Sequence, residues 1–184
     1  SLQAQQQEEA TDTDEEAARM RAEAFPALDE ACWAAQAKIH GLLAETGGTE
    51  VSYSGARTEP GDGQGAAPDA SVLITTLPDE AAAQRVQQAE EDRQSTCGEN
   101  PDYAAQVSTE RTTVDGTEYD VTTLGADSVS AGLIPGATVT TRDGARLIAV
   151  TLDEGAGAEA TPEQVLEAAQ AVRTAVAEEF GPAS

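Results

Sequence analysis

The chain has 184 residues, a length typical of one domain of ordinary size. Its 34 acidic residues against 10 lysines and arginines give a formal net charge of −24. Such a field repels phosphate backbones and anionic lipids, so the composition excludes a basic nucleic-acid interface and electrostatic attachment to a membrane surface. Aromatic residues make up 3% of the sequence, so the core must be built from Ala, Val, Leu and Ile.

Residues 1–24 form an acidic leader that we expect to be disordered. Residues 1–23 hold seven acids and four glutamines, with Leu2 and Met20 as the only large apolar side chains. A segment of this kind buries too little apolar surface to offset the entropy lost on ordering. We interpret it as a tether to a removed signal peptide, lipid anchor or membrane helix, followed by one domain over residues 25–182.

The first expected helix covers residues 26–45, where apolar residues recur at helical spacing until Gly47 and Gly48 end the pattern. A short strand is expected over residues 50–54. The loop over residues 55–70 then contains four glycines, two prolines and no side chain suited to a core.

The middle of the chain predicts a strand, a helix and two hairpins. The strand covers residues 71–77, and Pro78 opens a helix that reaches about residue 96. Asp-Gly turns at residues 115–116 and 143–144 then join strands 105–114 with 117–124, and 137–142 with 145–152. A second long loop, residues 125–136, separates the hairpins.

The last helix has the clearest signals. Thr161, Pro162 and Gln164 supply an N-cap, a first-turn proline and a capping-box glutamine, and Gly181-Pro182 ends the helix. The resulting order is α-β-β-α-β-β-β-β-α. Short turns require antiparallel pairing, and apolar helix faces need a sheet to cover, so we predict an α+β fold with an antiparallel sheet of about six strands and three packed helices.

Cys32 and Cys97 are the only cysteines. In an exported protein, two cysteines favour a disulfide. Two buried free thiols are the alternative. A redox pair is disfavoured because the spacing is far from Cys-x-x-Cys, and a metal site because the chain has one histidine. We expect no metal and no cofactor.

Catalysis is not expected. A Ser-His-Asp triad would need His40, the only histidine, and no serine lies in a Gly-x-Ser-x-Gly setting. A pair of catalytic carboxylates for glycoside cleavage would need aromatic platforms that the composition does not supply. We therefore predict a protein that is not an enzyme.

The candidate ligand site is a groove between the sheet and the loops at residues 55–70 and 125–136, because long loops tend to carry function. The candidate lining residues are Trp33, Tyr53, Tyr119 and Arg142, with Arg57 placed to clamp an acidic group. Each has a structural alternative. Trp33 also suits packing across the disulfide, and the tyrosines suit ordinary strand positions.

Three stretches carry a family resemblance: the strand and helix that run from Val72 through Pro78 to Cys97, the segment from Arg142 to Val150, and the helix after Thr161. Together they resemble the PknH-like extracellular sensor domain of actinobacteria, found as the outer domain of receptor serine/threonine kinases and as stand-alone surface lipoproteins. The resemblance implies an extracytoplasmic α+β domain with a cleft for an unidentified ligand and a membrane anchor. The family commonly has four cysteines, whereas this chain has two.

The first hypothesis is therefore a sensor or binding domain outside the membrane, with a small molecule or a cell-envelope component as its partner and a monomeric state. The alternative is a cell-surface protein-interaction module without a small-molecule pocket, in which Leu133 and Ile134 supply the contact. A hydrolase would need a convergent nucleophile and base, of which the sequence gives no sign.

Overall fold

The computed structural model describes residues 28–55, 69–125, 135–153 and 160–181, and every structural statement below concerns these residues. The predictions made for the leader at residues 1–24, for Arg57, and for Leu133 and Ile134 lie outside the described residues and stay predictions.

The described part is an α+β fold, as predicted. Its elements in chain order are α2 (Glu30–Thr46), β1 (Thr49–Gly55), β2 (Asp69–Thr76), α3 (Glu80–Gly98), α4 (Pro101–Ala104), β3 (Val107–Val114), β4 (Thr117–Leu124), β5 (Gly136–Asp143), β6 (Arg146–Asp153) and α5 (Pro162–Phe180).

The prediction missed α4, because no element was assigned between the helix that ends at about residue 96 and the strand expected from residue 105. Asn100 caps this short helix by accepting hydrogen bonds from the backbone amides of Asp102 and Tyr103, and Pro101 occupies its first turn. The strand therefore begins at Val107.

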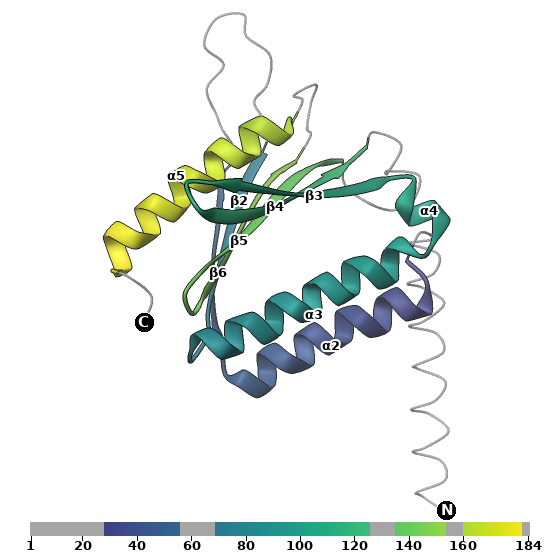
Figure 1. Cartoon of the computed structure of the whole chain (residues 1–184), viewed down its shortest axis with the longest axis horizontal. Coiled ribbons are helices and arrows are strands. Elements are labelled where there is room, and N and C mark those ends of the chain that lie inside the picture. Colours follow the sequence, from purple (N-terminus) through teal and green to yellow (C-terminus); the bar gives the residue numbers. More distant parts are fainter. Residues whose placement is uncertain (1–27, 56–68, 126–134, 154–159, 182–184) are drawn as a thin grey trace, which may run out of the picture.

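Six strands form one antiparallel sheet in the order β1-β2-β6-β5-β4-β3. In Figure 1, α5 crosses one face of the sheet, and α2 and α3 lie side by side beyond the other face. The tight turn between β3 and β4 requires positive φ at both central residues, and Asp115 and Gly116 adopt 50° and 77°. Both predicted hairpins are present, but the second turn lies at Gly144 and Ala145, one residue later than predicted, because Asp143 still pairs with Arg146.

The main core lies between α5 and the sheet. Alternate residues of the three strands under α5 point towards it, including Val139 of β5 with Ile148 and Val150 of β6, and all three are at most 1% exposed. Val165 and Ala169 of α5 pack onto this layer. Thr161 and Gln164 form the predicted capping box at the start of α5.

On the opposite side of the sheet, α2 and α3 form an antiparallel helix pair. A separate apolar cluster holds the two helices together, with Ile39, Ala83 and Val86 buried at its centre. At one end the predicted disulfide joins Cys32 of α2 to Cys97 of α3, with a Cα–Cα distance of 4.7 Å. The helix pair is thus one unit, tied together covalently as well as by packing.

We expect the double variant Cys32→Ala/Cys97→Ala to lose roughly 4 kcal/mol of unfolding free energy, because the disulfide closes a loop across a sequence separation of 65 residues. Urea unfolding of the variant, alongside the wild type with and without reductant, measures the loss. The reduced wild type should match the variant. An unchanged free energy in both would show that helix packing alone holds the pair.

Two aspartates face each other at the end of the sheet, since Asp69 of β2 is the register partner of Asp153 of β6. Burial raises the pKa of the Asp153 carboxyl above its ordinary value, and the negative charge of Asp69 raises that pKa further. The folded state therefore prefers the protonated form. Stability from this site is highest below the ordinary pKa of an aspartate and falls as pH rises through the raised value.

Asp153→Asn should therefore make the folded chain more stable than the wild type at neutral pH and no more stable in acid. Asp69→Asn should give a smaller gain, because it removes the repulsion and leaves the burial. Thermal unfolding of the wild type and the two variants, measured from acid to neutral pH, checks both statements. A destabilised Asp153→Asn at neutral pH would contradict the assignment.

Candidate functional site: a cleft between the sheet and the helix pair

A cleft of about 710 Å³ lies between the sheet and the helix pair α2–α3. Its floor comes from β2, β6, β5 and β4, and its opposite wall from one side of each helix. The floor residues include Leu73, Thr75, Thr140, Leu147 and Ala149, and the helical residues include Gln36, Ile39, His40, Leu43, Val86 and Gln87.

The cleft exists because the middle of the floor carries short side chains. Thr140 of β5 and Ala149 of β6 are register partners, and Leu73 of β2 pairs with Ala149 on its other side. Short side chains in this row do not reach the helices. Leu147 lies two residues before Ala149 in β6, on the same face, and packs into the apolar cluster of the helix pair. The helix pair thus meets the sheet at one end of the cleft and leaves space at the other.

Arginines from the sheet bridge to α3. Arg142 of β5 donates from Nε to Gln87 Oε1 at 3.1 Å and from Nη1 to Glu80 Oε1 at 2.6 Å. The long side chain of Arg142 therefore spans the separation between β5 and the first half of α3.

Arg111 of β3 makes the second bridge. Its Nε and Nη2 donate to the two carboxylate oxygens of Asp120 at 2.7 and 2.9 Å, and Nη2 also donates to Glu91 of α3 at 2.7 Å. The hydrogen bonds to Asp120 and then to Glu91 raise the pKa of Arg111 above its ordinary value. Two carboxylates of the cleft lining thus share one guanidinium, and the group of three keeps one unit of negative charge.

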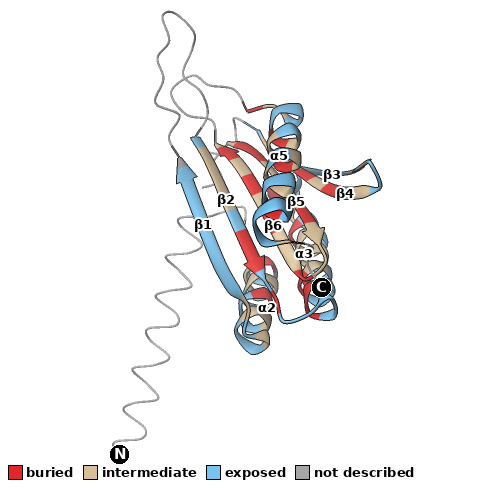
Figure 2. Cartoon of the chain, turned by 90° about the vertical axis from the view of Figure 1, so that its left-hand side faces the viewer, coloured by how far each residue is buried: buried red, intermediate tan, exposed pale blue. Residues whose placement is uncertain are grey.

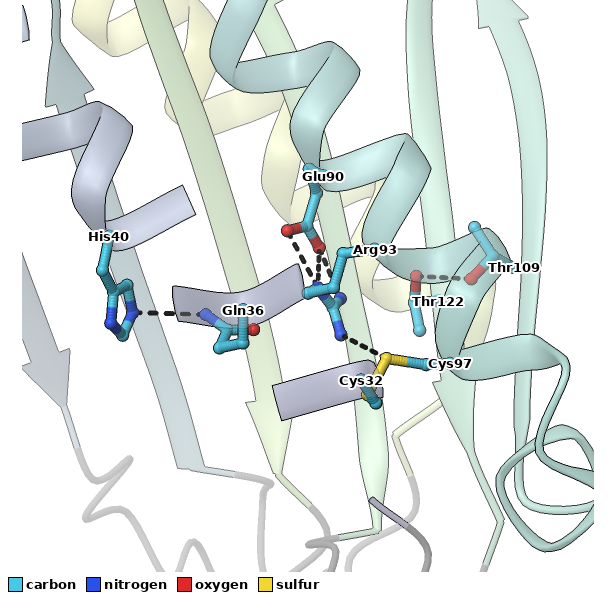
Figure 3. A network of polar contacts seen from close by, with 8 residues as sticks. All are labelled: Cys32, Gln36, His40, Glu90, Arg93, Cys97, Thr109 and Thr122. Atoms are coloured by element: carbon cyan, nitrogen blue, oxygen red, sulfur yellow. Dashed lines mark hydrogen bonds and ion pairs between the residues drawn. A yellow bond between two sulfur atoms is a disulfide. The ribbon is translucent and has the colours of Figure 1, made fainter. Parts of the chain in front are cut away.

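A third arginine lies within α3. Arg93 donates from Nε to both carboxylate oxygens of Glu90 at 3.1 and 3.0 Å, and its Nη1 lies 3.9 Å from Cys97 Sγ (Figure 3). Burial works against the positive charge, yet the contact with Glu90 more than offsets it, so the pKa of Arg93 is raised. Glu90 also lines the cleft, so a third lining carboxylate is paired.

Uncharged polar groups and one carboxylate complete the lining. Gln36 Nε2 lies 3.2 Å from His40 Nε2, one helical turn along α2 (Figure 3). On the floor, Thr75 Oγ1 donates to Glu50 Oε1 across the β1–β2 pair at 3.4 Å. The cleft therefore combines an apolar interior with a hydrogen-bonding margin, which is the usual composition of a small-molecule site.

The residues predicted for the ligand site do not converge. Trp33 is half-buried on α2 beside the disulfide and does not line the cleft. Tyr53 is 56% exposed on β1, on the side of the sheet away from the cleft, while Tyr119 is 3% exposed in the core beneath α5. Buried in that way, Tyr119 is not accessible to a ligand. Arg142 lies on the cleft face but is bound to α3.

The sequence reasoning missed the floor residues of the cleft, Leu73 and Thr75 among them. It predicted a strand over residues 71–77 without assigning its faces, and the structure turns Val72 and Ile74 towards α5 and Leu73 towards the cleft. The sequence did contain a signal for this: Val72, Leu73 and Ile74 are consecutive apolar residues, and a strand that is apolar on both faces is usually covered on both sides.

Comparison of the chain with protein-family models, curated proteins and solved structures finds no match. Among the described residues, no three His, Cys, Asp or Glu side chains gather to hold a metal ion. None of the helices in the described ranges is long and apolar enough to cross a membrane.

Replacing Arg111 tests how α3 is held. Arg111→Gln should lower the free energy of unfolding by less than about 1 kcal/mol, because the ion pairs are partly exposed to solvent. It should nevertheless speed amide hydrogen exchange in α3 near Glu91, since the helix loses its bond to β3. Arg173→Gln is the matched control, because Arg173 pairs with Asp143 from α5. Equal exchange of α3 amides in both variants would contradict the bridging role.

Proposed function

We propose that this protein is an extracytoplasmic, non-catalytic ligand-binding or sensor domain whose ligand occupies the cleft between the sheet and the helix pair. The observation that carries the proposal is the cleft itself. Its volume of about 710 Å³ falls within the range of small-molecule sites, and its interior is lined by Ile39, Leu43, Leu73, Val86 and Leu147.

The location is supported by the disulfide, because disulfides persist in oxidising compartments outside the cytoplasm. The resemblance to the PknH-like sensor domain adds the expectation of a membrane anchor, as a lipoprotein or as a kinase ectodomain. The acidic composition is compatible with that setting, since it keeps the domain soluble and away from anionic surfaces.

The non-catalytic assignment is supported by the chemistry of the lining. His40 is the one imidazole of the chain, and its ring nitrogen contacts the amide of Gln36. A general base would instead contact a nucleophile and an orienting carboxylate.

A cell-surface interaction module is the second candidate, favoured by β1. This strand lies at one edge of the sheet, and its residues with assigned burial are exposed (Figure 2), including Val51 at 46% and Tyr53 at 56%. An exposed edge strand offers backbone hydrogen bonds to an added strand, with side-chain contacts on alternate residues. This mode would use the edge and leave the cleft empty.

Native mass spectrometry of the protein purified from its natural host tests the first candidate. We expect a non-covalent adduct that disappears on denaturation. Leu73→Trp should abolish it, because Leu73 is 37% exposed on the cleft floor and the larger indole fills the space. Val51→Trp is the matched control, since it enlarges an exposed residue facing away from the cleft.

An adduct retained by Leu73→Trp and lost in Val51→Trp would move the ligand to the edge strand and favour the interaction module. A clean native mass for the wild type, together with no binding of apolar probes in solution, would overturn the proposal.

A further inference from the structure

The charge of the cleft indicates which ligands it accepts, an inference that rests on the proposed function. Four carboxylates line the cleft: Glu50, Glu90, Glu91 and Asp120. Among the described lining residues there is no lysine or arginine. Three of the four contact an arginine outside the lining: Glu90 pairs with Arg93, and Glu91 and Asp120 share Arg111, which leaves one unit of negative charge on that shared group.

Glu50 is the exception. Its one hydrogen bond within the described residues comes from the hydroxyl of Thr75, and none of the ion pairs there involves it. Thr75 is 5% exposed, so its hydroxyl is fixed by packing in β2. A hydroxyl donor orients a carboxylate without cancelling its charge.

The surroundings of Glu50 strengthen the negative potential at this end of the cleft. The helix α2 ends at Thr46, close in sequence to Gly48 and Glu50, which both line the cleft. Its last turn carries no basic residue. The partial negative charge of a helix C-terminus is therefore not offset there by a cation of the same helix.

Apolar side chains lie next to this carboxylate. Across the sheet, Glu50 of β1 pairs with Thr75 of β2, and Thr75 pairs with Leu147 of β6. Leu43 of α2 lines the opposite wall. A group bound here would have one charged contact and an apolar environment for the rest of its length. Glu50 is exposed on the edge strand β1, so its carboxylate is accessible to a positively charged group that approaches from solvent.

We propose that the cleft takes an amphiphile with a single positive head, either a protonated amine or a quaternary ammonium, and an apolar body. Glu50 receives the head, and the apolar body lies between Leu73 of the floor and Ile39 and Val86 of the helix pair. An anionic amphiphile of the same length is rejected twice, by Glu50 and by the net charge of −24.

Isothermal titration of the purified full chain with three ten-carbon probes tests this selectivity: decylammonium, decanol and decanoate, each kept below its aggregation concentration at physiological ionic strength. The wild type should bind decylammonium about tenfold more tightly than decanol, and decanoate more weakly than decanol. Glu50→Gln should remove the tenfold difference and leave decanol binding unchanged, since it keeps the shape and the hydrogen bond from Thr75.

Non-specific attraction of cations to an acidic chain is controlled by Glu167→Gln. This residue is exposed on α5, on the far side of the sheet, and the change removes the same unit of charge. It should retain the tenfold preference. Equal loss in both variants would show that net charge, not Glu50, attracts the probe, and would overturn the inference.

Replacing decylammonium with decyltrimethylammonium distinguishes the two kinds of head. Tighter binding of the primary amine indicates hydrogen bonds to Glu50, and equal binding indicates charge alone; either result fits the proposed class. If decanol binds as tightly as decylammonium and Leu73→Trp blocks both, the charge selectivity is wrong while the cleft remains a ligand site. If none of the probes binds, the inference is wrong, and if the native mass is also clean, the proposed function fails with it.

Discussion

The distance between the sheet and the helix pair is the constraint on which the rest of this structure depends. On the α5 side, branched side chains of β5 and β6 bring helix and sheet into close packing. On the other side, Thr140 and Ala149 are too short to do so, and Arg111 and Arg142 span the separation instead. Guanidinium groups suit this purpose because they reach across space that water or a ligand also occupies, with several donors in fixed geometry.

Two arginines, the bridging Arg111 and Arg93 within α3, shape the electrostatics of the cleft. In a chain with 34 acids and 10 basic residues, most carboxylates must stay in solvent or repel one another. Arg93 and Arg111 pair with three carboxylates of the lining, and among the described residues Glu50 is the lining carboxylate that has no ion pair. The selectivity proposed for the cleft thus depends on where the arginines lie, since the carboxylate without one is the group offered to a positive head.

The fold could be predicted from the sequence better than the candidate site, because the two depend on interactions of different range. The capping box at Thr161 and the Asp115-Gly116 turn depend on neighbours a few residues away, so the sequence alone predicted them. The cleft depends on how far a helix lies from a sheet, which no local pattern encodes. Tyr119 illustrates the failure: its aromatic ring was taken as a ligand contact, and the parity of β4 directs it into the core.

The disulfide could be predicted from two cysteines, but its role at the cleft could not. By joining the start of α2 to the end of α3, it fixes the two helices relative to each other before any ligand arrives. The Arg93 guanidinium beside Cys97 couples that junction to Glu90 in the lining. A preformed wall removes part of the ordering cost that a ligand would otherwise meet. The covalent bond that stabilises the fold therefore also preorganises the site, and reduction should affect binding through the shape of the cleft even where the domain stays folded.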